Sequence, residues 1–186
     1  WQNRGINMWT IEEKTIDLVK GTATYDLPAD TIDIMEQVIR TNNGITATQS
    51  DLNISRISFA TYSSIPNKLT QARPIQIVVH RLRDAPQVTL WPVPDQGTAL
   101  APFYVLKYWR MRRIQDAGSG VETPDMTFRF LPVVVAGLAY YIAMKAPELV
   151  ERLPMLKAAY DEQFGIAAGE DREKAAIRLV PRLSNW

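Results

Sequence analysis

The sequence predicts an α+β protein, in which an antiparallel β-rich region precedes a C-terminal helix bundle and an extended C-terminal arm. From residue 8 to about residue 114, short runs of β-branched and aromatic residues alternate with turn residues, a pattern typical of strands. After residue 125, apolar residues recur at helical spacing. The glycine, serine and proline content of DAGSGVETPD between them indicates a linker. We expect a single domain with a β-rich region at 1–115, a linker at 116–125, a helical region at 126–174 and an arm at 175–186.

Composition excludes several classes of protein. The 186 residues suffice for one core-bearing domain, and 46% hydrophobic with 22% charged residues excludes global disorder. A net charge of +1 provides no whole-molecule attraction for nucleic acid or acidic membranes. The absence of cysteine excludes disulfides, thiol catalysis and thiolate metal sites. Because the chain opens on Trp1 rather than methionine, we expect residues to precede it.

The β-rich region begins with a predicted hairpin, in which Lys20-Gly21 joins TIDLV to TATYDL. Pro28 closes the second of these strands because it cannot donate to a ladder. The strand IDIMEQVIR follows, and it stops at NNG, where asparagine and glycine tolerate positive φ. Further strands are predicted at 74–84, 86–94 and 103–114, whereas residues 55–67 fit either a short helix or a long loop.

The helical region contains the most apolar part of the chain, VVVAGLAYYIAMKAP at 133–147. A helix of that length reaches roughly 22 Å, too short for a hydrocarbon core of about 30 Å. Pro132 and Pro147 fit the two helix boundaries. Because large and small apolar residues surround this helix, we expect it to be buried and covered on every side, including at Leu138 and Tyr141.

A second, amphipathic helix is predicted from the recurrence of Leu156, Tyr160, Phe164 and Ala167. Gly165 and Gly169 each cost it about 1 kcal/mol relative to alanine. Either another backbone approaches closely there, or the helix end is frayed and weak. The arm that follows, AAIRLVPRLSNW, is richer in apolar residues than a solvated tail. It either folds back on its own core or docks on another subunit or partner.

We find no pattern of catalytic or metal-binding residues. The single histidine, His80, has no neighbouring nucleophile signature and cannot supply a nitrogen-rich metal site. Phosphate-binding glycine motifs are also missing from the sequence. We therefore predict a protein that is not an enzyme, with no catalytic residues, no cofactor and no metal.

Basic residues on two predicted strands are the candidates for contact with nucleic acid. Arg81 and Arg83 are expected to share one strand face, and Arg110 and Arg112 another, with aromatic residues interleaved in KYWRMRR. Such a pattern can grip a nucleic-acid backbone. A solvated sheet face or a charged contact between subunits gives the same pattern, so both interpretations stay open.

The order of the segments resembles the head-to-tail adaptor (connector) proteins of tailed bacteriophages, including the tail tubular protein A type of short-tailed phages. The residues that carry the resemblance span most of the chain. They are GTATYDLPAD (21–30), IDIMEQVIR (32–40), TLWPVPD (89–95), VLKYWRMRRI (105–114), FRFLPVVVAGLAYYIAMKAPELVERLPMLKAAYDEQF (128–164) and DREKA (171–175).

The resemblance implies a virion protein of the neck, between the capsid portal and the tail. It implies a ring of identical subunits, a dodecamer, that extends the DNA channel without sequence-specific binding and offers a docking surface to the tail nozzle protein. The helical region would face the portal and the β-rich region the tail. Portal binding would fall to the arm, through Ile177, Arg178, Leu179, Val180, Arg182, Leu183 and Trp186, while Arg81, Arg83, Arg110 and Arg112 would face the channel or a neighbouring subunit.

Two other functions stay open at this point, while a third, a small hydrolase, is disfavoured because the chain has a single histidine and no cysteine. One is a nucleic-acid-binding module that uses the basic strands, for which salt-dependent binding to free duplex is the discriminating observation. The other is a different phage tail-completion protein, which would share the ring and contact different neighbours. None of these predicted functions involves a membrane.

Overall fold

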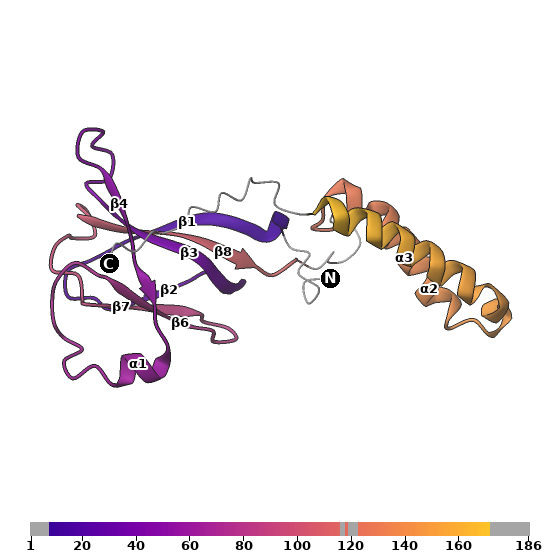
Figure 1. Ribbon diagram of the computed structural model, residues 1–186, viewed down its shortest axis with the longest axis horizontal. Helices are drawn as coiled ribbons and strands as arrows, with labels where there is room; N and C mark the ends of the chain where they lie inside the picture. The colour runs from indigo at the N-terminus through magenta and orange to yellow at the C-terminus, as the bar shows by residue number, and fades with distance from the viewer. Residues whose placement is uncertain (1–7, 116–117, 119–122, 172–186) are drawn as a thin grey trace, which may run out of the picture. The chain divides into compact units, whose positions relative to one another are not determined.

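The computed structural model describes residues 8–115, 118 and 123–171. The chain divides into two compact units, Trp9–Glu122 and a second unit that comprises Trp1–Met8 and Thr123–Trp186. We call them the β unit and the helical unit. The predicted α+β class, with antiparallel sheets followed by helices, is confirmed (Figure 1). The expected single-domain organisation stays a prediction.

Within the described residues, the β unit consists of two four-stranded sheets (Figure 1). The first sheet has the order β1-β8-β3-β4 and is antiparallel throughout. The second has the order β2-β7-β6-β5, in which β5 and β6 pair in parallel. The strands are β1 (Ile11–Asp17), β2 (Thr24–Asp26), β3 (Thr31–Thr41), β4 (Ser50–Asn53), β5 (Ser55–Arg56), β6 (Gln76–His80), β7 (Gln87–Trp91) and β8 (Tyr104–Arg112).

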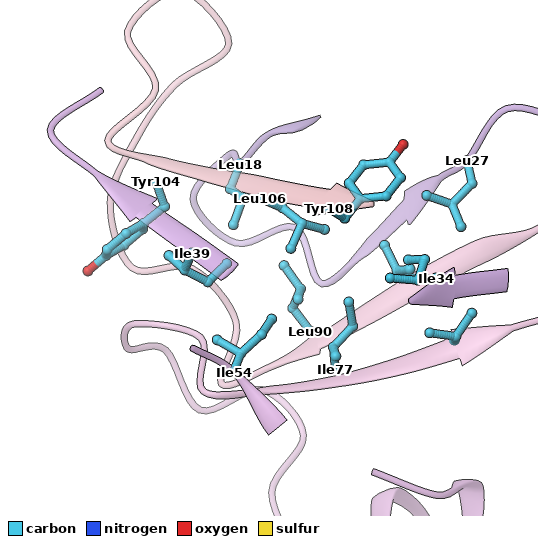
Figure 2. Packing of buried hydrophobic residues seen from close by; sticks show 12 residues of the cluster. Leu18, Leu27, Ile34, Ile39, Ile54, Ile77, Leu90, Tyr104, Leu106 and Tyr108 are labelled. Carbon is cyan, nitrogen blue, oxygen red and sulfur yellow. The ribbon is translucent and has the colours of Figure 1, made fainter. Parts of the chain in front are cut away.

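The two sheets bury one hydrophobic core between them, which Figure 2 shows from close by. Side chains alternate along β8, so that Leu106 and Tyr108 point into the core, where Leu90 of β7 and Ile77 of β6 join them. Each fully buried aliphatic side chain contributes about 2 kcal/mol relative to exposure. The cluster comprises Leu18, Leu27, Ile34, Ile39, Ile54, Ile77, Val79, Val88, Leu90, Tyr104, Leu106 and Tyr108.

The predicted hairpin at Lys20-Gly21 is wrong. The turn exists, with φ of 80° at Gly21, but β1 pairs with β8 and β2 pairs with β7, so the chain passes from one sheet to the other. Tyr25 stabilises this crossing, because its hydroxyl accepts a hydrogen bond from Val19 N–H at 2.9 Å and lies 3.0 Å from the carbonyl oxygen of Thr22. A turn residue pair thus marks a reversal without specifying which strands pair.

The other predicted strands lie at the expected positions, but some differ in length from the prediction. The strand at 32–40 is β3, and it ends at Asn42 and Gly44, whose φ angles of 51° and 83° are positive as expected. The prediction for 74–84 is too long, since β6 ends at His80. In residues 55–67 the chain forms β5 and a short helix, α1 (Phe59–Ser63). The side chain of Ser58 caps α1 by accepting a hydrogen bond from Thr61 N–H at 3.1 Å.

The helical unit is built on two helices, α2 (Leu131–Ala143) and α3 (Leu153–Glu170), which lie side by side (Figure 1). Short 3-10 helices precede each of them, η3 (Phe128–Phe130) and η4 (Pro147–Arg152). Proline stands in the first turn of both α-helices, where its missing N–H costs nothing. Where the helices meet, the rings of Tyr140 and Tyr160 stack with their centroids 6.5 Å apart.

The expectation that α2 is covered on every side is wrong for the described part of the chain. Val133, Gly137 and Ala143 are buried, but Leu138 and Tyr141 are 58% and 57% exposed. The reason is that a single neighbouring helix can cover one face. Among the described residues, no helix combines the length and the apolar character needed to cross a membrane.

Gly137 and Gly165 form a matched pair that tests the packing of this hairpin. A Cβ at Gly137 would lie 3.0 Å from the Tyr160 ring, whereas nothing lies within 4 Å of a Cβ at Gly165. We expect Gly137→Val to destabilise the helical unit by about 2 kcal/mol through overpacking. Gly165→Ala should stabilise α3 by up to about 1 kcal/mol. Urea unfolding followed by circular dichroism measures both, and equal effects would contradict the described contact.

Candidate interaction surfaces

Arg110 is part of a buried ion cluster rather than an exposed surface. Arg110 is 4% exposed. Its guanidinium donates hydrogen bonds to the carboxylates of Glu12 in β1 and of Asp30 before β3. It also donates to the hydroxyl of Thr31, at 2.7 Å. Alternation along β8 places it on the face that carries Tyr108, at the end of the core. A charge can be buried there because both carboxylates accept its hydrogen bonds.

The cluster ties together three segments that are far apart in the sequence. Asp30 is 80 positions from Arg110, and Glu12 is 98 positions from it. The hydrogen bond from Arg110 lowers the pKa of the Asp30 carboxyl, although partial burial acts in the opposite direction. Ionised Asp30 thus stabilises the contact between Arg110 of β8 and the segment that leads into β3.

The other three arginines lie in different settings. Arg81 and Arg83 follow the end of β6 instead of sharing a strand face, because the strand stops at His80. Arg81 contacts Asp33 of β3 at 2.5 Å, and Arg83 is 94% exposed beside Asp84. Arg112 stays half-buried on β8 and donates to the carbonyl oxygen of Arg113 at 3.3 Å. The roles of Arg81, Arg83 and Arg112 in contact with DNA or a subunit stay predictions.

On the opposite face of β8, cation and aromatic side chains are paired within the β unit. The ammonium group of Lys107 lies 5.3 Å from the ring centroid of Trp109 and 2.9 Å from the Glu13 carboxylate. Some of the alternating basic and aromatic residues that suggested nucleic-acid binding are therefore used for contacts within the sheet.

The helical unit presents the largest concentration of exposed apolar side chains in the described chain. On α2, Leu131, Val135, Leu138 and Ile142 are each more than half exposed, and we call these four residues the α2 surface. Their spacing of four, three and four residues keeps them in one row along the helix. Other exposed apolar residues of this unit are Phe128, Tyr141, Met144, Val150, Met155 and Ile166.

The exposed side of α3 carries small residues among charged and large apolar ones. Ala158 and Ala159 are exposed, and nothing lies within 4 Å of a Cβ at Gly165 or Gly169. No backbone of this chain therefore explains the two glycines within the described residues. The alternatives for them, close approach of another backbone or a weak helix end, stay open. The arm residues Ile177, Arg178, Leu179, Val180, Arg182, Leu183 and Trp186 lie outside the described residues.

The described residues contain neither a metal-binding cluster nor a histidine free of structural contacts. No group of three or more histidine, cysteine or acidic side chains there could hold a metal ion. His80 has a structural contact, since its Nε2 lies 2.9 Å from the Thr89 hydroxyl.

Sequence reasoning missed both the acidic partners of Arg110 and the exposure of α2. The row at 131, 135, 138 and 142 was visible as a second apolar stripe beside the buried one. It would have indicated a second neighbour rather than burial in one core. Nothing in the sequence indicated that residues as distant as Glu12 and Asp30 meet one arginine.

Replacing Arg110 tests the ion cluster. We expect Arg110→Met to lower the free energy of unfolding by about 2 kcal/mol, because Glu12 and Asp30 lose their partner but remain partly solvated. The lowered pKa of Asp30 means that its contribution is complete above about pH 4 and is lost as the pH falls further. Wild type and variant should therefore approach one another in acid. Denaturant titrations at several pH values measure this.

Arg40→Met is the matched control, because Arg40 also makes two hydrogen bonds to one carboxylate, that of Asp51, but at the exposed edge of the sheet. Its loss of stability should be smaller. A larger loss for Arg40→Met than for Arg110→Met would contradict the structural role of the buried cluster.

Comparison with known proteins adds a family. A family model described as SU10 adaptor protein matches residues 1–180. A search of curated proteins finds no match.

Proposed function

The chain belongs to the SU10 adaptor protein family, and we propose that it forms a ring between the portal and the tail nozzle and extends the DNA channel. Membership makes it a phage adaptor protein with a structural role at the head–tail junction, in contact with other phage structural proteins. The family match across residues 1–180 is the observation that carries the proposal. The ring, the dodecamer, the tail tubular A type and a role in DNA ejection belong to the proposal.

The exposed apolar side chains of the helical unit support assembly into a ring. Ten large apolar residues there are each more than half exposed, and a buried side chain of this kind accounts for roughly 100 Å². The exposed part sums to on the order of 600 Å², and four of these residues, those of the α2 surface, form one row. A closed ring needs two different complementary flanks on each subunit. The α2 surface is apolar, whereas the exposed side of α3 mixes small, charged and apolar residues, so the two surfaces differ.

Charge supports a channel that holds DNA weakly. Contacts that neutralise many phosphates retain DNA strongly, whereas this chain has a net charge of +1. Arg110, one of the four arginines expected on a basic surface, is committed to Glu12 and Asp30. This arrangement gives the nucleic-acid-binding module less support than the adaptor.

In the proposed neck, the helical region faces the portal and the β-rich region faces the nozzle. The arm at 175–186 engages the portal through its apolar residues and Arg178 and Arg182. Double-stranded DNA passes through the lumen without sequence-specific binding. Native mass spectrometry of the purified protein, alone and with portal protein, tests the assembly directly. A protein that remains monomeric and does not bind the portal would reject the proposal.

Substitution on the α2 surface separates folding from assembly. We expect Leu138→Asp to keep the far-ultraviolet circular dichroism of the wild type, because the side chain is 58% exposed. The ring should be lost, because each contact would bury an unpaired charge. Lys157→Asp, an exposed polar position on α3, is the control and should assemble normally. Native mass spectrometry reads the outcome, and a normal ring from Leu138→Asp would remove the α2 surface from the interface.

Deletion of residues 175–186 tests the arm. We expect the shortened chain to fold, since residues between Leu18 and Tyr108 already build the described hydrophobic core of the β unit. It should no longer bind portal rings, because it lacks the proposed docking segment. Co-sedimentation with portal protein measures this, and unchanged incorporation of the shortened chain would reject the role of the arm.

A further inference from the structure

The second sheet has an incomplete edge beside β6. β5 pairs with β6 at Ser55 and Arg56, and the last backbone hydrogen bond between the two segments runs from Ile57 N–H to the carbonyl oxygen of Ile77 at 2.9 Å. The chain then leaves to form α1. By the alternation of a β ladder, the N–H and C=O groups of Val79 point toward this edge. Among the hydrogen bonds of the described residues, none joins Val79 to the departing chain.

A groove of roughly 630 Å³ occupies the place where β5 would have continued. It is bounded by the departing chain, from Arg56 to Phe59, and by the second half of β6 with the residues after it, from Val78 to Leu82. Residues of an edge strand therefore line a concave surface, in which Val79 keeps 6% of its surface exposed. This is the arrangement into which an extended peptide adds as a further strand.

One side of the groove is basic. Arg56 and Arg81 both reach the Asp33 carboxylate, at 2.8 Å and 2.5 Å, and their side chains are 35% and 61% exposed. Two register shifts in β3 flank this position, and bulges of this kind re-aim a side chain. Two guanidinium groups share one carboxylate, so the local charge is positive. Each guanidinium has five N–H donors, more than these contacts use.

The other side of the groove is apolar. Phe59 of α1 packs edge-on against the His80 ring, with the centroids 5.1 Å apart, and remains 57% exposed. His80 lies on the same sheet face as Thr89, whereas Val79 faces the core. Because the arginines reach across to β3 of the other sheet, an added strand would present alternate residues to the arginines and to Phe59.

We propose that this groove binds an extended segment of a partner protein, with alternating acidic and apolar residues, which adds to the β6 edge. A peptide uses all three features at once: the free main-chain groups, the arginine pair and the apolar wall. Duplex DNA uses only one of them, the arginine pair. The proposal does not rest on ring formation, since all the groove residues come from a single subunit.

The probe is the end-blocked peptide Val-Glu-Val-Glu-Val, labelled with a fluorophore and titrated into the full chain. We expect saturable binding by fluorescence anisotropy, and slower hydrogen–deuterium exchange over the peptide fragment that contains Val79. Val-Gln-Val-Gln-Val should bind about fivefold more weakly, because it loses the charge of the hydrogen bonds to the arginines. An N-methylated version of the first peptide, which cannot complete the ladder, should not bind.

Arg81→Glu should weaken binding of the first peptide by about tenfold, through loss of attraction and added repulsion. Arg83→Glu is the matched control, because Arg83 is 94% exposed and lies outside the groove; its effect should stay within about twofold. The site is overturned if the peptide does not bind, if the N-methylated peptide binds equally, or if exchange at Val79 is unchanged. Displacement of the peptide by a short DNA duplex would instead assign the groove to phosphate. Each result is independent of whether the chain forms a ring.

Discussion

The arrangement of the helical unit depends on one constraint: α2 is apolar on all sides, and in the described part of the chain α3 covers one of them. The covered side is closely fitted, with Tyr160 against the backbone at Gly137 and stacked on Tyr140. The uncovered side repeats apolar residues at a regular helical spacing. Solvent exposure of such a row is costly, and the proposed ring would relieve that cost by placing a neighbour on it. The composition of one helix thereby connects folding to assembly.

The β unit differs from the helical unit, because its hydrophobic core is enclosed by strands of the same chain. Two sheets share one core, and the end of that core is closed by Arg110 with its two carboxylates. A buried arginine is tolerable where its terminal N–H groups are met from separate segments, and it then holds those segments in one arrangement. The unit is therefore suited to act as a rigid support, and its exposed features, such as the β6 edge, keep a defined geometry.

Local patterns in the sequence predicted the class of the fold and most strand positions, because strand and turn propensities act over a few residues. The run at 32–40 and its stop at Asn42 and Gly44 are examples. Pairing was not predictable in this way: Lys20-Gly21 marks a turn but not the change of sheet that it makes. The acidic partners of Arg110 were equally hidden, since they are 80 and 98 positions away. β4 was missed because SDLN is polar and lies at a sheet edge.

The pairing of β1 with β8 joins the first strand of the β unit to its last, for example Ile11 to Met111. During synthesis, β1 leaves the ribosome long before its partner exists, so its backbone groups must remain hydrated until nearly the whole unit has been made. Contacts of such wide sequence separation slow the search for the native topology. Until β8 has been made, the edge of β1 stays unpaired, and an unpaired strand edge favours association with other chains.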